Sequence, residues 1–305
     1  MSEKVLFVCS KGFPEGAYIP QHEPVISAFD HGFLYGDGVF EGIRIYDGAI
    51  FRLDKHLDRL YRSLEYLGME VPFDREFITD HMIEVARRNR IVNGYIRPVI
   101  SRGDGDLGLN PEKCKHPTLV LIADTIILYP KEYYEEGLRL ILSSIPKNSK
   151  KALNPNAKLT QYINNIRAVR EANLRVAQEA MMLDSAGYVA ECTGDNIFMI
   201  NKKGLCTPTT ENALPGITRE TIVDIARNIG ITVHEQRLKP HHFYKADEVF
   251  VTGTAAEVCP VREIESNIIG DGNPGPVTRQ FMEEFRKATK DPKYLTHIHQ
   301  YSGRS

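Results

Sequence analysis

The sequence lacks the long apolar runs of a membrane-spanning helix, and it carries almost no excess of charge. No stretch comes near the roughly 18–20 apolar residues that such a helix needs. A formal net charge of -2 over 305 residues gives no electrostatic basis for binding nucleic acid or an anionic membrane. We therefore expect neither nucleic acid nor a membrane among the partners of this protein.

Cysteine is scarce and unpatterned. The five cysteines are scattered and contain no CxxC pair, so a disulfide framework is not predicted. His241 and His242 are adjacent and His56 stands alone, a spacing that does not suit metal ligands. The N-terminal stretch "MSEKVLFVCSKG" has too short an apolar core for a signal peptide. These features predict a cytoplasmic protein with reduced thiols and no metal site.

Helix-like and strand-like segments alternate along the whole chain. "LDKHLDRLYRSLEYLG" and "DREFITDHMIEVARRN" have helical periodicity, the second with Asp74 as N-cap, whereas "GYIRPVISRG" and "TLVLIADTIIL" are β-branched strands. The stretch "YPKEYYEEG" is polar and aromatic without a period, as in a linker. We predict an α/β (mixed α+β) fold with a small N-terminal domain (1–124), an interdomain linker (125–136) and a large C-terminal domain (137–305).

The larger domain is predicted to contain two turns rich in small residues. "ALPGITRETI" places Pro215-Gly216 before a helix, with Thr218 as N-cap, so the N–H groups of its first turn could bind an anion. "VTGTAAEV" follows a strand, and its small side chains leave the backbone approachable. Together the turns suggest a bound phosphate. No GxxxxGK[ST] motif is present, nor a GxGxxG motif between a strand and a helix, so nucleotide binding is not the natural interpretation.

One carboxylate and one lysine complete this pattern. Glu191 ends one of three strands predicted between residues 179 and 209, and if buried it needs a cationic partner. The stretch "KNSKKALNPNAKLTQYINN" holds four lysines, of which Lys147, Lys150 and Lys151 lie in polar sequence and are expected to be solvated. Lys158 is predicted to open a helix, and the apolar or aromatic residues that follow it can keep its amine dry: Leu159, Tyr162, Ile163 and Ile166. A desolvated amine is what a Schiff-base lysine requires.

Five segments in register carry a resemblance to a known family: "HGFLYGDGVFEGIR", "YIRPVISRGDGDLGLNP", "AKLTQYINNIRAVREA", "ALPGITRETI" and "ADEVFVTGTAAEVCPV". They resemble the class IV (fold type IV) pyridoxal phosphate aminotransferases, and most of all the branched-chain amino acid aminotransferases. The resemblance implies pyridoxal 5'-phosphate as cofactor. It also implies a homodimer or hexamer with its active site at a dimer interface.

The resemblance also implies the roles of individual residues. Lys158 would be the Schiff-base lysine that moves the substrate proton, and Glu191 would face the pyridine nitrogen of the cofactor. Tyr162 would hydrogen-bond the ring oxygen. The cofactor phosphate would be held by Arg59, Ile217, Thr218 and Thr254.

Substrate residues follow from the same resemblance. Tyr95 and Arg97, with the backbone of Thr254 and Ala255, would bind the substrate carboxylate. The side-chain pocket would be walled by Tyr35 and Phe40, with Leu109 contributed across the dimer interface. The implied reaction is reversible transfer of the amino group of L-leucine, L-isoleucine or L-valine to 2-oxoglutarate. Two alternatives on the same fold stay open, a D-amino acid aminotransferase and an aminodeoxychorismate lyase.

Overall fold

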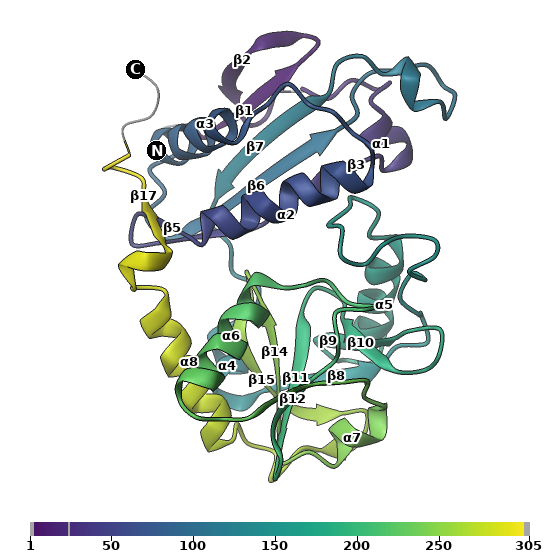
Figure 1. The fold of residues 1–305 in the computed structure, drawn as a ribbon, viewed down its shortest axis with the longest axis vertical. Coiled ribbons are helices and arrows are strands. Elements are labelled where there is room, and N and C mark those ends of the chain that lie inside the picture. The colour runs from purple at the N-terminus through teal and green to yellow at the C-terminus, as the bar shows by residue number, and fades with distance from the viewer. Residues whose placement is uncertain (1–2, 24, 302–305) are drawn as a thin grey trace. The chain divides into compact units, whose positions relative to one another are not determined.

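A computed structural model describes residues 3–23 and 25–301 of the chain (Figure 1). The described residues divide into two compact units. The first holds the residues up to Ile126, those from Ala157 to Gln161 and those from Thr289 onward, and the second holds Ile127–Asn156 and Tyr162–Ala288. The chain thus leaves the second unit for five residues around Lys158 and returns to it at Tyr162.

The first unit is built on one sheet in the order β17-β5-β4-β6-β7-β1-β2, with β3 paired to β6. All the described pairs in this sheet are antiparallel. Its strands are β1 (Val5–Ser10), β2 (Phe13–Pro20), β3 (Gly38–Phe40), β4 (Ile43–Tyr46), β5 (Ala49–Phe51), β6 (Gly94–Ser101), β7 (Thr118–Asp124) and β17 (Leu295–His297). Strand β17 comes from the far C-terminal end of the chain, which the sequence predicted to belong to the large domain.

The helices of the first unit are α1 (His31–Tyr35), α2 (Leu53–Tyr66) and α3 (Arg75–Arg88), with short 3-10 turns at Pro111–Lys113 and Pro292–Tyr294. Helix α2 buries the leucine stripe that the sequence shows, at Leu53, Leu57, Leu60 and Leu64. Helix α3 is capped by Asp74, whose side chain accepts a hydrogen bond from the N–H of Phe77, as predicted. Both helices lie against the sheet of this unit (Figure 1).

The second unit contains a mixed sheet in the order β10-β9-β8-β15-β14-β11-β12-β13, with β16 paired to β15. Its parallel pairs join β8 to β9, β8 to β15, and β12 to β13. The strands are β8 (Leu138–Leu142), β9 (Glu179–Leu183), β10 (Val189–Cys192), β11 (Asn196–Asn201), β12 (Gly204–Thr207), β13 (Val233–Glu235), β14 (Glu248–Gly253), β15 (Glu257–Ile264) and β16 (Asn267–Ile268). The region 179–209 therefore holds four strands where three were predicted, because a turn separates β10 from β11.

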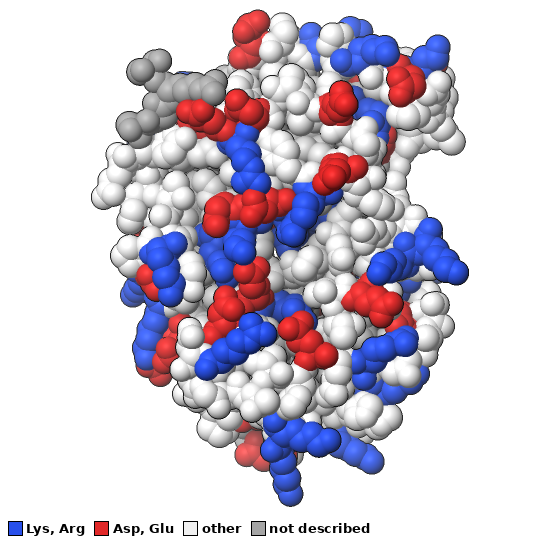
Figure 2. Space-filling model, viewed as in Figure 1, with Lys and Arg blue, Asp and Glu red and all other residues white. Residues whose placement is uncertain are grey.

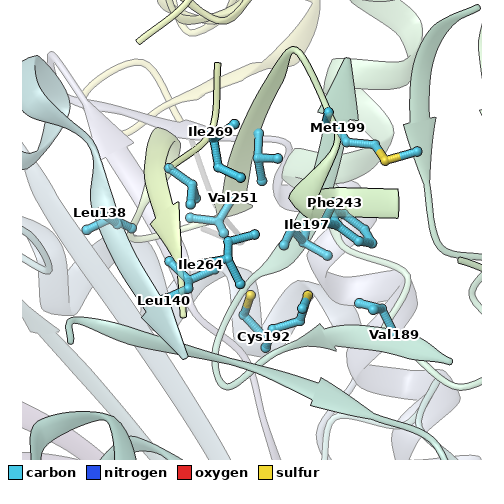
Figure 3. Packing of buried hydrophobic residues seen from close by; sticks show 14 of the residues in the cluster. Leu138, Leu140, Val189, Cys192, Ile197, Met199, Phe243, Val251, Ile264 and Ile269 are labelled. Atoms are coloured by element: carbon cyan, nitrogen blue, oxygen red, sulfur yellow. The ribbon is translucent and has the colours of Figure 1, made fainter. Parts of the chain in front are cut away.

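The helices of the second unit are α4 (Lys131–Glu136), α5 (Ile163–Leu174), α6 (Ile217–Asn228), α7 (Pro240–Tyr244) and α8 (Pro276–Ala288). A buried apolar cluster, shown in Figure 3, joins β8, β10, β11, β14 and β15 through side chains such as Leu140, Ile197 and Val251. The mixed α/β class that the sequence predicted is confirmed.

The stretch predicted as a linker is ordered against this core. Residues 131–136 form helix α4, and Tyr129, Tyr133 and Tyr134 pack on the apolar cluster. The Tyr134 hydroxyl donates to the carbonyl oxygen of Ala256 at 3.1 Å, which fixes the segment to the second unit. The tyrosines of this stretch therefore attach it to the apolar cluster of the second unit.

Two further observations concern the charge of the surface and the length of the helices. On the face shown in Figure 2, Lys and Arg side chains are intermixed with Asp and Glu. Within residues 3–23 and 25–301, we find no helix with both the length and the apolar character needed to cross a bilayer.

Candidate active site

The residues singled out from the sequence divide between the two units. The first unit carries Tyr35, Phe40, Arg59, Tyr95, Arg97, Leu109 and Lys158, and the second carries Tyr162, Glu191, Ile217, Thr218, Thr254 and Ala255.

Lys158 does not open a helix, which corrects the sequence-based expectation. Helix α5 begins five residues later, at Ile163. Lys158 and its neighbours instead run beside β3: the N–H of Phe40 donates to the Lys158 carbonyl at 3.1 Å, and the N–H of Thr160 donates to Gly38 at 3.0 Å. The Ser63 hydroxyl accepts from the Lys158 N–H at 2.9 Å. This pairing along an extended backbone outcompetes the helical periodicity of the segment.

The Lys158 amine lies inside the first unit, although part of the residue reaches solvent. Its Nζ atom is 4.5 Å from the centre of the Phe40 ring. Burial lowers the pKa of Lys158 most and the Arg59 guanidinium lowers it further, so that the pKa falls from 10.5 to about 8. Of the residues expected to keep it dry, Leu159 is buried, but Ile163 and Ile166 are 68% and 61% exposed. The desolvation was predicted, but two of the four residues expected to cause it face solvent.

Arg59 belongs to a buried cluster with two residues that the sequence reasoning did not select. Glu41 Oε1 accepts from Arg59 Nε at 2.6 Å, and Glu41 Oε2 accepts from Arg59 Nη2 at 2.8 Å. His56 Nδ1 lies 2.8 Å from Glu41 Oε2. Burial alone would raise the pKa of Glu41, but the Arg59 guanidinium and these hydrogen bonds hold that pKa well below its usual range. The carboxylate is therefore ionised and fixes the guanidinium in one orientation.

Tyr95, Arg97 and Phe40 form a second group in the first unit. Arg97 Nη2 donates to the Tyr95 hydroxyl at 3.1 Å, and its guanidinium carbon lies 4.7 Å from the centre of the Phe40 ring. Arg97 Nε is buried and has no hydrogen-bond acceptor among the described residues. A cation held this way, with an unused donor, suits a ligand carboxylate.

Tyr35 and Leu109 lie at the surface of the first unit. The Tyr35 hydroxyl donates to the carbonyl oxygen of Leu107 at 2.6 Å, which ties the end of α1 to the loop that carries Leu109. The Leu109 side chain is 77% exposed. Leu109 is therefore open to solvent in its own unit.

Glu191 is buried at the end region of β10, and its cationic partner is Lys147. Lys147 Nζ lies 2.7 Å from Glu191 Oε1, and the two side chains are only 11% and 10% exposed. The expectation that Lys147 is solvated is therefore wrong, because a polar sequence neighbourhood does not reveal a partner 44 positions away. Lys150 and Lys151 are exposed, as expected.

The two turns rich in small residues are brought together by one dipeptide, Asp195-Asn196. A Cβ atom on Gly216 would lie 2.0 Å from Asn196 Oδ1, and a Cβ atom on Gly253 would lie 2.0 Å from Asp195 Oδ1. A side chain at either position would force the Asn196 or Asp195 side chain to move. Glycine in both turns thus permits the present close approach of the Asp195 and Asn196 side chains.

The donor set around these turns fits a phosphate. Helix α6 begins at Ile217 with Gly216 as N-cap, so Thr218 lies in the first turn and is not the N-cap as predicted. No described side chain caps this helix, which leaves the positive end of the helix dipole to a ligand. Thr254 and Ala255 occupy the turn after β14, and the buried Thr252 hydroxyl has no hydrogen-bond partner in the described chain.

Tyr162 is the N-cap residue of α5 and is partly buried. It lies near enough to Lys147 to contribute, after Glu191, to a raised pKa of that lysine. Tyr162, Lys147 and Glu191 thus share one region of the second unit.

Sequence reasoning missed Lys147, Glu41, His56 and Asn196. A signal for His56 was present, since it lies three residues before Arg59 on the same face as the buried leucines of α2. Nothing local marked Lys147. In the described part of the chain no group of three or more His, Cys, Asp and Glu side chains could hold a metal ion.

Known proteins share both the sequence and the fold. The family model described as amino-transferase class IV matches residues 38–264. A putative branched-chain-amino-acid aminotransferase of Methanocaldococcus jannaschii is 43% identical over 90% of this chain and 95% of its own length. The branched-chain-amino-acid aminotransferase of Pseudomonas aeruginosa is 36% identical over 89% of this chain and 90% of its own.

Solved structures agree with these matches. The branched-chain amino acid aminotransferase from T.th., solved with pyridoxamine 5'-phosphate, superposes with a TM-score of 0.91 at 36% identity, covering 98% of this chain and 99% of its own. The same protein has been solved with N-(5'-phosphopyridoxyl)-L-glutamate. The chain therefore belongs to the class IV aminotransferases and, within them, to the branched-chain amino acid aminotransferases.

Proposed function

We propose that this chain catalyses the reversible transfer of the amino group of L-leucine, L-isoleucine or L-valine to 2-oxoglutarate, with pyridoxal 5'-phosphate as cofactor. The observation that carries the proposal is the Lys158 amine, which is withdrawn from water and has a pKa of about 8. Such an amine is available in its neutral, nucleophilic form near physiological pH. The family membership and the phosphate-bearing ligands of the solved relative support the same function.

Lys158 would bind the cofactor and then move a proton. Pyridoxal phosphate supplies an electron sink for the negative charge left when a substrate proton is removed. The Lys158 Nζ atom, freed during turnover, would accept that proton and return it, and a pKa of about 8 suits both steps. The Phe40 ring beside Nζ excludes water from the amine.

The remaining cofactor contacts are proposed from the family resemblance. Glu191 would hold a proton on the ring nitrogen, and Tyr162 would donate to the ring oxygen. The phosphate would be bound by Arg59, by the first turn of α6 at Ile217 and Thr218, and by Thr254. Arg59 is suited to this role because Glu41 fixes its guanidinium.

Substrate would be recognised by its carboxylate and its aliphatic side chain. Arg97, with its unused Nε donor, and Tyr95 would bind the carboxylate, together with the backbone of Thr254 and Ala255. Tyr35 and Phe40 would contact the side chain. Because one methylene is worth only about 1–3 kcal/mol in an apolar pocket, several aliphatic amino acids are expected to react.

The proposal extends to assembly, domains and location. A homodimer, or a hexamer built from dimers, would place Leu109 of one copy in the active site of its partner, which accounts for a leucine that is 77% exposed. The two domains would correspond to the two compact units described above, with the cofactor bound mainly by the C-terminal one. The five cysteines are free thiols, which supports a cytoplasmic location.

The visible spectrum tests this function. Purified protein with pyridoxal phosphate should show an absorption band that L-leucine bleaches and D-alanine does not. Bleaching by D-alanine alone would instead establish a D-amino acid aminotransferase, and no band at all would exclude the cofactor. Lys158→Ala should abolish the band, whereas Lys150→Ala, a change at an exposed lysine of the same stretch, should leave it intact.

A further inference from the structure

Lys147 is held in place by the second unit before any ligand is considered. Its backbone N–H donates to the Leu183 carbonyl at 2.9 Å, which fixes the loop after β8 to strand β9. Its side chain is 11% exposed and ends at Glu191 Oε1, 2.7 Å away. A lysine is seldom buried without such a partner, because burial disfavours its charge.

The second oxygen of Glu191 is bound as well. Glu191 Oε2 accepts from the N–H of Leu214 at 3.0 Å and from Asn196 Nδ2 at 3.3 Å. Asn196 Nδ2 also donates to the Leu214 carbonyl at 2.9 Å. Leu214 stands two residues before Gly216, the N-cap of α6. The carboxylate is therefore fixed on both oxygens, and the cation among these described donors is Lys147.

Tyr162 also contributes to the electrostatic surroundings of Lys147. Burial lowers the pKa of Lys147, but Glu191, followed by Tyr162 and Glu179, outweighs it, and the pKa is raised. The ammonium therefore stays charged in a place with little water. Glu191, the residue proposed to meet the ring nitrogen of the cofactor, is in direct contact with this charge.

We propose that Lys147 is a positioning residue of the cofactor site, whose ammonium holds the Glu191 carboxylate in one orientation. This inference rests on the function proposed above. Lys147 has no covalent or proton-transfer step of its own, and acts through Glu191. In metal sites, residues that act through a ligating side chain change affinity or activity about 10- to 100-fold when they are removed, and we expect an effect of the same order here.

A double-mutant cycle tests the assignment. The dissociation constant for pyridoxal phosphate is measured by absorbance titration for the wild type, Lys147→Met, Glu191→Gln and the double variant. Lys147→Met should weaken binding about 10- to 100-fold, and the double variant should bind no more weakly than Glu191→Gln. Lys147→Arg, which keeps the charge, should bind nearly as the wild type does. Lys150→Met and Lys151→Met are exposed controls expected to be unchanged.

A spectroscopic readout separates positioning from a structural role. The absorption band of the bound cofactor should change its wavelength or its pH dependence in Lys147→Met and keep both in Lys147→Arg. Unchanged affinity and spectrum in Lys147→Met, or losses that multiply in the double variant, would overturn the assignment. If circular dichroism shows that Lys147→Met is unfolded, Lys147→Gln is used in its place. A changed affinity and spectrum would again support the assignment, and an unchanged affinity and spectrum would overturn it. If the wild type binds no cofactor, the proposed function itself is overturned. If the wild type binds the cofactor and Lys147→Met binds it equally well, only this inference is overturned.

Discussion

Glu41 and Arg59 form a two-pronged ion pair inside the first unit, with Arg59 Nε 2.6 Å from Oε1 and Nη2 2.8 Å from Oε2 of the carboxylate. Both side chains are almost completely buried, at 0% and 3% exposure. The pair places a fixed positive charge near Lys158, and its carboxylate limits how far that charge depresses the lysine's pKa.

Glu41→Gln should destabilise the protein strongly. The substitution keeps the shape of the side chain but leaves the buried Arg59 charge uncompensated, which typically costs about 3–5 kcal/mol. Urea unfolding followed by circular dichroism measures the change. Glu84→Gln is the matched control, because Glu84 pairs with Arg88 at 2.8 Å on an exposed helix face, where such pairs contribute about 0.3–0.5 kcal/mol. Equal losses in the two variants would contradict the assignment of a buried, uncompensated charge.

The lowered pKa of Lys158 should make stability depend on pH in the cofactor-free protein. Its pKa is about 8 when folded and 10.5 ordinarily, so between these values the unfolded chain binds more protons. Stability from this group therefore rises as pH increases from about 8 to 10.5, by roughly 3 kcal/mol. Lys158→Met removes the titrating group.

Urea unfolding of both proteins at several pH values across that window isolates the effect. The free energy of unfolding of the wild type, minus that of Lys158→Met, should increase as the pH rises. A difference that stays constant would show that the amine titrates as an exposed lysine does.

Sequence reasoning predicted a desolvated Lys158 amine, and the structure shows one with different surroundings. The apolar residues after it face outward on α5, as Ile163 does, while its actual surroundings come from Phe40 and Ser63, far earlier in the chain. Local periodicity cannot reveal such partners, because a strand-like pairing with β3 overrides the helical pattern. The fold class and the strand that carries Glu191 were predictable, since periodicity and turn residues act locally.

Lys147 was predicted to be solvated, but its side chain is largely buried. Its neighbours Asn148 and Ser149 belong to a polar loop, so the composition of the loop predicts a solvated lysine. Its burial depends on Glu191 and on the pairing of the loop with β9, which are long-range consequences of the sheet. What the sequence did predict was that a buried Glu191 would need a cation, without identifying which one.

Gly216→Ala should weaken cofactor binding. A methyl group there would lie 2.0 Å from Asn196 Oδ1, so the Asn196 amide, which donates to Glu191, must move. Overpacking of this kind typically costs about 1–3 kcal/mol. The dissociation constant for pyridoxal phosphate measures the effect. Gly194→Ala is the control, since a Cβ atom at Gly194 meets nothing within 4 Å. Similar affinities in the two variants would argue against the coupling of this turn to Glu191.

Tyr95→Phe should impair substrate binding more than turnover. The change removes the hydroxyl that accepts a hydrogen bond from Arg97 Nη2 at 3.1 Å, so the guanidinium is less firmly oriented toward a carboxylate. Hydrogen bonds to charged groups are worth about 1.5–3 kcal/mol, so KM for L-leucine should rise about tenfold or more, with a smaller change in kcat. Steady-state kinetics with L-leucine and 2-oxoglutarate measure both constants.

Tyr61→Phe provides the comparison for this variant. It also removes a tyrosine hydroxyl from the first unit, one that donates to the Phe73 carbonyl, but this tyrosine has no proposed role in binding. Its KM should match that of the wild type even if its stability falls. A Tyr95→Phe variant that kept the wild-type KM while losing kcat would mean that Tyr95 acts on the reacting atoms and not through Arg97, because only interactions that strengthen in the transition state change kcat alone.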